Sequence, residues 1–197
     1  MSMERDLQFL YEIGTLRFVP RQWQRFLNTG VANLTEHHYR VMWLALVIAA
    51  GEKGADINKV LKMALVHDIA ESRTNDVDYI SRQYVERNEQ LGLKDMLANT
   101  SVEKEFLAIA HEYEKRESLE AKIVKDADNL EIDLELKEQK AAGANLQDEL
   151  APMRKIVHDN HLYTKTAKKL VAQINESNPH DWHTKGRNRV NSGDWKK

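Results

Sequence analysis

The chain of 197 residues contains no cysteine. This absence excludes disulfide scaffolds, cysteine nucleophiles, iron–sulfur clusters and zinc sites built on thiolates. Only three prolines and eight glycines interrupt the sequence. Because these two residue types are the strongest breakers of regular structure, their scarcity favours long helices. We therefore expect an all-α protein.

The sequence also lacks a strong charge of one sign and a long hydrophobic run. Its 29 basic and 31 acidic residues give a formal net charge of -2, whereas proteins that bind nucleic acid usually carry a basic excess. The longest apolar run, residues 41–50, is about half of what a bilayer span requires. The first ten residues lack the apolar core of a signal peptide. We expect no nucleic-acid partner, no membrane segment and a cytoplasmic location.

Hydrophobic residues recur at helical spacing along most of the chain. The pattern predicts helices near residues 6–16, 35–50, 56–67, 76–97, 102–113, 118–143, 152–163 and 166–174. It also predicts a short helix within residues 17–35. Thr35 and Asp56 are the expected N-terminal caps of the helices at 35–50 and 56–67. We expect Gly92 to interrupt the helix at 76–97, and Pro152 to lie in the first turn of the helix at 152–163. Residues 1–177 are thus expected to form one helical domain, with residues 178–197 as an irregular tail packing on it.

Four side chains of metal-ligand type stand on three of the predicted helices. His67 and Asp68 end an apolar helix, where burying them is unfavourable unless they are paired or bind a cation. His37 starts the most apolar helix, and Asp128 flanks the hydrophobic stripe of the longest one. Two imidazoles and two carboxylates suit a divalent transition metal such as Mn, Fe, Co, Ni or Zn better than calcium.

Several neighbouring residues compete for these roles. His38 and Asp126 are alternative ligands, each close in sequence to the favoured one. His111 is a candidate for a second metal, although it more readily fills a helix face. The second His-Asp pair, His158 and Asp159, is typical of a surface helix.

The candidates belong to a series of short motifs spread over residues 7–143. These are Val19-Pro20-Arg21 with Trp23, Glu36-His37-x-Tyr39-Arg40, Leu65-Val66-His67-Asp68-x-Ala70-Glu71 with Asp76, Glu112-Tyr113-Glu114, Glu120-Ala121 and Val124-Lys125-Asp126-Ala127-Asp128. In this order and spacing the chain resembles the HD-domain metal-dependent phosphohydrolases, and within them the 5'-deoxynucleotidase-like branch. The resemblance implies an all-helical HD bundle. The metal ligands that it implies are His37, His67, Asp68 and Asp128.

The resemblance implies that Glu71 and Asp76 are acid/base residues. Glu71 lies four residues after His67, one helical turn along, where a carboxylate could orient a metal-bound water or take its proton. Asp76 lies in a polar loop, from which it could protonate a leaving alkoxide. The structural alternatives are a salt bridge for Glu71 and a helix cap for Asp76.

Arg21, Trp23 and Arg25 are the candidates for substrate binding. Guanidinium groups suit the recognition of phosphate oxygens, and an indole ring could stack on a base. Their structural alternatives are ordinary surface and core positions. The segment 76–97 could cover the site.

The sequence thus predicts a metal-dependent 5'-nucleotidase that acts on 2'-deoxynucleoside 5'-monophosphates. The alternatives are hydrolysis of another phosphorylated metabolite, such as a phosphodiester or an alarmone, and a metal-binding regulatory module without turnover. Apolar helix surface left over from a single bundle predicts a homodimer.

Overall fold

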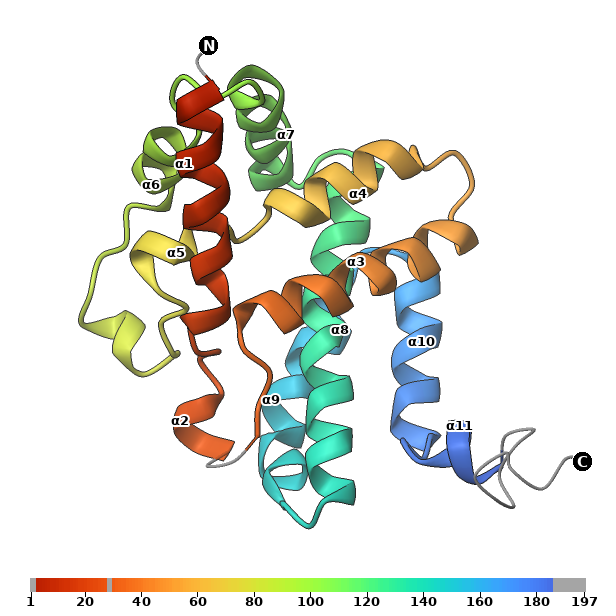
Figure 1. The fold of residues 1–197 in the computed structure, drawn as a ribbon. Coiled ribbons are helices and arrows are strands. Elements are labelled where there is room, and N and C mark those ends of the chain that lie inside the picture. The colour runs from red at the N-terminus through yellow and green to blue at the C-terminus, as the bar shows by residue number, and fades with distance from the viewer. Residues whose placement is uncertain (1–2, 28–29, 186–197) are drawn as a thin grey trace, which may run out of the picture.

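The computed structural model describes residues 3–27 and 30–185, and within them it is all-helical, as predicted (Figure 1). Its elements are α1 (Met3–Ile13), η1 (Gly14–Phe18), α2 (Gln24–Leu27), α3 (Leu34–Gly51), α4 (Ile57–Val66), α5 (Glu71–Thr74), η2 (Ser81–Gln83), α6 (Glu89–Leu97), α7 (Glu103–Lys115), α8 (Leu119–Ala141), α9 (Leu146–Asn160), α10 (Lys165–Glu176) and α11 (Asp181–Thr184). No helix in this part of the chain is both long and apolar enough to cross a membrane.

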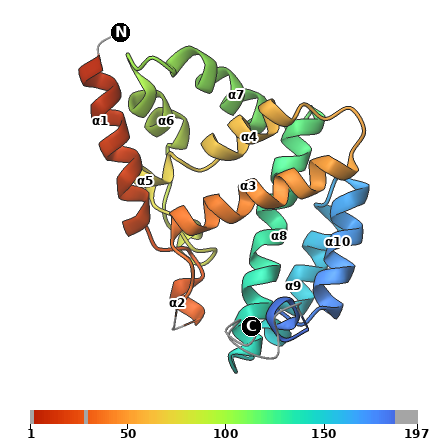
Figure 2. The ribbon, with the colours of Figure 1, turned by 45° about the vertical axis from the view of Figure 1, so that its right-hand side comes forward.

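Helix α8 is the centre of the bundle. Helix α3 crosses it, while α4, α7, α9 and α10 also pack on it (Figures 1 and 2). Helices α1, α5 and α6 lie together on the side of α4 and α7 away from α10. The main core contains fully buried residues of α3, α4 and α8, among them Val41, Ile48, Met63, Ile123 and Leu130, and α10 also contributes to it. The crossing of α3, α4 and α8 therefore brings distant segments of the chain to one place.

Helix α3 begins one residue earlier than predicted, and its cap is not Thr35. The Asn33 side chain accepts a hydrogen bond from the Glu36 backbone, and the Glu36 side chain accepts one from the Asn33 backbone. This reciprocal arrangement satisfies two amides that the helix leaves unpaired. The predicted cap at Asp56 is confirmed, because its carboxylate accepts from two amides of the first turn of α4.

The single polar helix predicted over residues 76–97 is wrong. The chain leaves the helical conformation at Asn75, whose φ is 60°. The Asp78 carboxylate then accepts hydrogen bonds from two following backbone amides, and such local bonds compete with a helix. After the short 3-10 helix η2, α-helix resumes only at α6, which Asn88 caps. Gly92 lies inside α6 rather than interrupting it.

The last third of the chain departs from the prediction only at element ends. Helix α9 begins at Leu146, so Pro152 lies beyond its first turn. Helix α10 begins just before the predicted start, with Thr164 as its cap. Of the predicted tail, residues 178–185 include the short helix α11, and residues 186–197 lie outside the described residues. The domain division at residue 177 stays a prediction.

Candidate metal and active site

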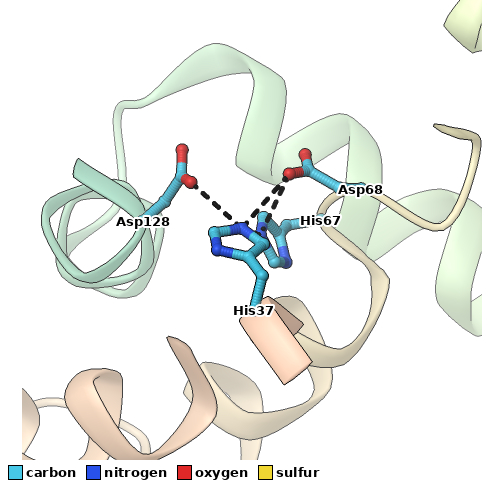
Figure 3. A group of neighbouring side chains, drawn as sticks. All are labelled: His37, His67, Asp68 and Asp128. Atoms are coloured by element: carbon cyan, nitrogen blue, oxygen red, sulfur yellow. Dashed lines mark hydrogen bonds and ion pairs between the residues drawn. The ribbon is translucent and has the colours of Figure 1, made fainter. Parts of the chain in front are cut away.

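The four predicted metal ligands lie together where α3, α4 and α8 meet (Figure 3). One donor atom from each lies within 4.8 Å of the others. The His37 Nε2 atom is 3.4 Å from Asp128 Oδ1 and 3.7 Å from Asp68 Oδ2. The Nε2 atoms of His37 and His67 are 3.4 Å apart. These side chains therefore form one compact group, although three separate segments of the chain supply them.

Helix ends explain how adjacent residues reach the same point. His67 is the C-terminal cap of α4, and Asp68 follows it where the regular helix has ended. The His67 Nδ1 atom lies 2.8 Å from the Ala64 carbonyl oxygen. A carbonyl oxygen only accepts, so Nδ1 carries the proton and Nε2 offers its lone pair to the cluster. A hydrogen bond of this kind is the usual support of a metal-ligating histidine.

Glu131 provides the same support for His37, a role that was not predicted from the sequence. Its Oε2 atom accepts a hydrogen bond of 2.9 Å from His37 Nδ1, and its side chain is 2% exposed. Burial disfavours its charge, but the hydrogen bond to His37 leaves the pKa of Glu131 below its usual value. Glu131 lies three residues after Asp128 on α8, which is the spacing of neighbours on one helix face.

The charges of the cluster favour a bound cation. Burial opposes ionisation of Asp68 and Asp128, but His67 beside the first and Lys125 beside the second leave the pKa of each carboxyl well below its usual value. Burial and Arg21 oppose protonation of His37, yet hydrogen bonds to the surrounding carboxylates hold its pKa well above the usual value. Paired carboxylates and two imidazoles match the ligand preferences of a divalent transition metal, so these residues fit such an ion.

The competing candidates lie elsewhere. Asp126 accepts hydrogen bonds from the Tyr163 amide and from the amide and hydroxyl of Thr164, so it holds the start of α10. His38 is buried beside His67, with ring centroids 4.5 Å apart, but it is outside the four-residue group. His158 bonds to Asp133, on α8, at 2.9 Å.

Glu71 and Asp76 both lie beside the cluster, in different surroundings. Burial, together with the charges of Asp68 and Asp76, raises the pKa of Glu71 to about 9. Arg87 Nη1 donates to its Oε1 atom at 3.2 Å, whereas its Oε2 atom is buried and takes no hydrogen bond from the described residues. Glu71 therefore has one carboxyl oxygen held in place and one available.

Asp76 is paired with the predicted substrate residue Arg21. The Arg21 Nη1 atom donates to Asp76 Oδ2 at 2.6 Å, and both side chains are buried. The Gln22 amide donates to the same oxygen at 3.0 Å, and Arg82 Nη2 lies 3.7 Å from the other. Two guanidinium groups thus face one carboxylate.

The other two substrate candidates are placed less directly at the site. Trp23 lines its edge but is 7% exposed, and it packs with Leu27, Ile132 and Leu136. Arg25 is exposed and donates to Asp78 Oδ2 at 3.0 Å, beside a separate cavity of about 490 Å³. The structure therefore brings Arg21 and Trp23 to the cluster, while Arg25 lies outside it.

A polar cavity of about 290 Å³ opens onto the cluster, and its walls include His67, Asp68 and Asp128. Its cationic side chains are Arg21, Arg82, Arg87, Arg116, Lys125 and Arg154. Lys125 donates to Asp128 Oδ2 at 2.7 Å. Apart from Arg21, these cations could not be assigned to the site from the sequence, because loops and separate helices contribute most of them. Lys125 is the exception, because its position three residues before Asp128 in the sequence indicated that it lies near this ligand.

The chain belongs to the HD domain family, whose model matches residues 13–175. It is 34% identical to the zebrafish protein named 5'-deoxynucleotidase HDDC2, over 66% of this chain and 67% of that protein. The human protein of the same name is 33% identical over 67% of each chain. The crystal structure of the PH0347 protein from Pyrococcus horikoshii OT3 matches with a TM-score of 0.73 and 25% identity, over 86% of this chain and 98% of that one.

Proposed function

We propose that the protein is a metal-dependent phosphohydrolase that removes the 5'-phosphate from 2'-deoxynucleoside 5'-monophosphates. The observation that carries the proposal is the His37, His67, Asp68 and Asp128 group, which opens onto a cavity lined with cationic side chains. Relatives about one third identical carry the name 5'-deoxynucleotidase, which supports this substrate class. Phosphoryl transfer depends mainly on positioning and charge neutralisation, and this cavity provides both.

His37, His67, Asp68 and Asp128 would hold a divalent transition metal through Nε2 and carboxylate oxygens. When bound, such an ion polarises a phosphate oxygen and makes a coordinated water more acidic. The protein itself supplies Arg21 and Lys125 as counter-charges for the phosphate.

Glu71 is the acid/base residue that the geometry favours. Without a bound ion, burial and the charges of Asp68 and Asp76 raise its pKa to about 9, and Oε2 is the oxygen free to exchange a proton. Asp76, fixed between Arg21 and Arg82, orients Arg21 toward the phosphate. Its alternative role as proton donor to the leaving oxygen stays a prediction.

Release of phosphate from the four common 2'-deoxynucleoside 5'-monophosphates, assayed with Mn, Co, Ni, Fe and Zn, tests the proposal. We expect turnover only with added metal. Asp68→Ala should lose both metal and turnover. Glu71→Gln should keep the metal while turnover falls about 10²–10⁴-fold, as for a lost acid/base group. Full activity of Asp68→Ala, or of the metal-stripped protein, would contradict the proposal.

We further propose that the protein is a homodimer. Tyr39, Trp43 and Val47 recur every four residues along α3 and are 61%, 56% and 54% exposed. A connected row of large apolar side chains on a surface commonly marks an interface. Sedimentation of the parent and of Trp43→Glu across a range of concentrations tests this, and a monomeric parent would contradict it. The cytoplasmic location stays a prediction.

A further inference from the structure

A second cavity adjoins the polar one, and we propose that it binds the nucleobase of the substrate. This side chamber, about 610 Å³ in volume, is lined by residues of α6 and α7 that include Leu93, Leu107, Ala110 and His111, and by Asn88 and Gln90 at the start of α6. The inference rests on the proposed function, because it assigns the base-binding part of the same substrate.

The two cavities share one wall. The residues that line both of them are His67, Asp68, Glu71, Arg87, Glu89, Tyr113 and Glu114. A molecule with its phosphate beside the metal cluster can therefore extend past Glu71 into the side chamber without leaving the protein surface. Helices α6 and α7 pack against each other beside the end of α4 (Figure 1), which places the side chamber at the cluster rather than across the molecule.

The chemistry of the two cavities differs as the two ends of a nucleotide differ. Charged side chains dominate the polar cavity, which suits a phosphate and its sugar. Beyond the charged wall that the two cavities share, the side chamber adds the apolar surface of Leu93, Leu107 and Ala110 and the polar groups of Gln90 and His111. Ligand sites are typically apolar with a few polar groups that fix orientation, and a nucleobase has a flat apolar face with a polar edge.

Gln90 and His111 are available to such an edge. Both side chains are exposed, and no hydrogen bond engages either one elsewhere in the part of the chain that the structure describes. Between them they offer an amide and an imidazole, which can each donate and accept. Trp23, the other candidate for contact with the base, is by contrast packed in a hydrophobic cluster.

The test compares 2'-deoxyadenosine 5'-monophosphate with 2-deoxyribose 5-phosphate, which presents the same kind of leaving oxygen without a base. For Gln90→Ala/His111→Ala we expect KM for the nucleotide to rise about tenfold, the effect of roughly one lost hydrogen bond. Turnover of 2-deoxyribose 5-phosphate should stay unchanged. Leu107→Trp, which fills the side chamber, should impair the nucleotide selectively in the same way.

Ala108→Trp is the matched control, since it adds the same ring at an exposed position of α7 outside both cavities. Equal impairment of both compounds, or no effect of either variant, would overturn the assignment. A parent protein that hydrolyses neither compound would contradict the proposed function instead. In that case calorimetry with 2'-deoxyadenosine still decides on the side chamber, because binding weakened by Leu107→Trp but not by Ala108→Trp supports it and unchanged binding refutes it.

Discussion

The hydrogen bond between His37 and Glu131 fixes the orientation of one imidazole at the cluster. Glu131→Gln keeps the shape of the side chain but removes its charge. We expect metal affinity to fall about 10–100-fold, the usual effect of changing a group that supports a ligating histidine. Metal titration of the purified variant measures this. Glu138→Gln is the control, because this exposed residue of the same helix pairs with Arg40 rather than with a ligating histidine.

The position of Asp76 between two arginines predicts how its loss affects different substrates. Asp76→Asn weakens the contact that holds Arg21, so the phosphate should be misplaced whatever the leaving group. We expect kcat/KM to fall about 100-fold with both a 2'-deoxynucleotide and p-nitrophenyl phosphate. If p-nitrophenyl phosphate, which scarcely needs a proton on its leaving oxygen, is spared, Asp76 is instead the acid that the sequence suggested.

At the residue scale, the sequence predicts which side chains form the cluster better than it predicts their partners. His67 and Asp68 were recognisable because polar residues at the end of an apolar helix need compensation. The distinction between Asp126 and Asp128 depended on the family resemblance. The structure shows its physical basis, because Asp126 accepts a hydrogen bond from the amide of Thr164, the cap of α10. Arg87 comes from a loop, where no periodicity indicates the direction of a side chain.

At the scale of elements, long helices were predictable and their junctions were not. The hydrophobic stripe of α8 and the cap of α4 are local features, so the sequence contains them in full. The course of residues 76–88 depends instead on side chains such as Asp78, which bonds to the backbone beside it. Local hydrogen bonds of this kind override a weak helical pattern, and they bring Arg82 and Arg87 to the polar cavity.

Helices α8 and α9 are joined by a buried ion pair whose loss should destabilise the fold. Arg154 donates to both oxygens of Asp133, at 2.9 and 2.7 Å. Asp133→Asn leaves the guanidinium without its counter-charge, and removing one partner of a buried pair typically costs about 3–5 kcal/mol. Urea unfolding at neutral pH measures the loss. Asp159→Asn, on an exposed pair with Lys155, should change stability by less than about 1 kcal/mol.

The ion pair between Asp133 and Arg154 also predicts how the stability of the fold changes with pH. Burial opposes the charge of Asp133, but hydrogen bonds to His158 and Arg154 leave its pKa below the usual value. A carboxyl with a depressed folded pKa contributes stability that is fully present above its unfolded pKa, about 3.9, and is lost as the pH falls through the folded pKa. The difference between the parent and Asp133→Asn should therefore shrink as the pH falls below about 4. A difference that grows in acid would contradict this.

At the scale of the whole molecule, the cluster joins three helices, α3, α4 and α8, that come from separate parts of the chain. An ion held by α3, α4 and α8 binds the folded state and not the unfolded one, so it must stabilise the fold. At a free concentration one hundred times its Kd, the gain is about 2.7 kcal/mol. For a chain of this length each kcal/mol raises the unfolding midpoint by about 2–4 °C.

We therefore expect the unfolding midpoint of the parent to rise by about 5–11 °C when Mn or Co is added at that excess. The midpoint should fall back to the value of the metal-free protein when a chelator is added. Calorimetry on metal-stripped protein measures both steps. Asp68→Asn removes a ligand charge with little change in shape, so its midpoint should be the same with and without metal. Glu71→Gln, which leaves the ligands intact, should respond like the parent. A metal-dependent rise of equal size in Asp68→Asn would show that the ion binds elsewhere on the molecule, and the assignment of the cluster would then be wrong.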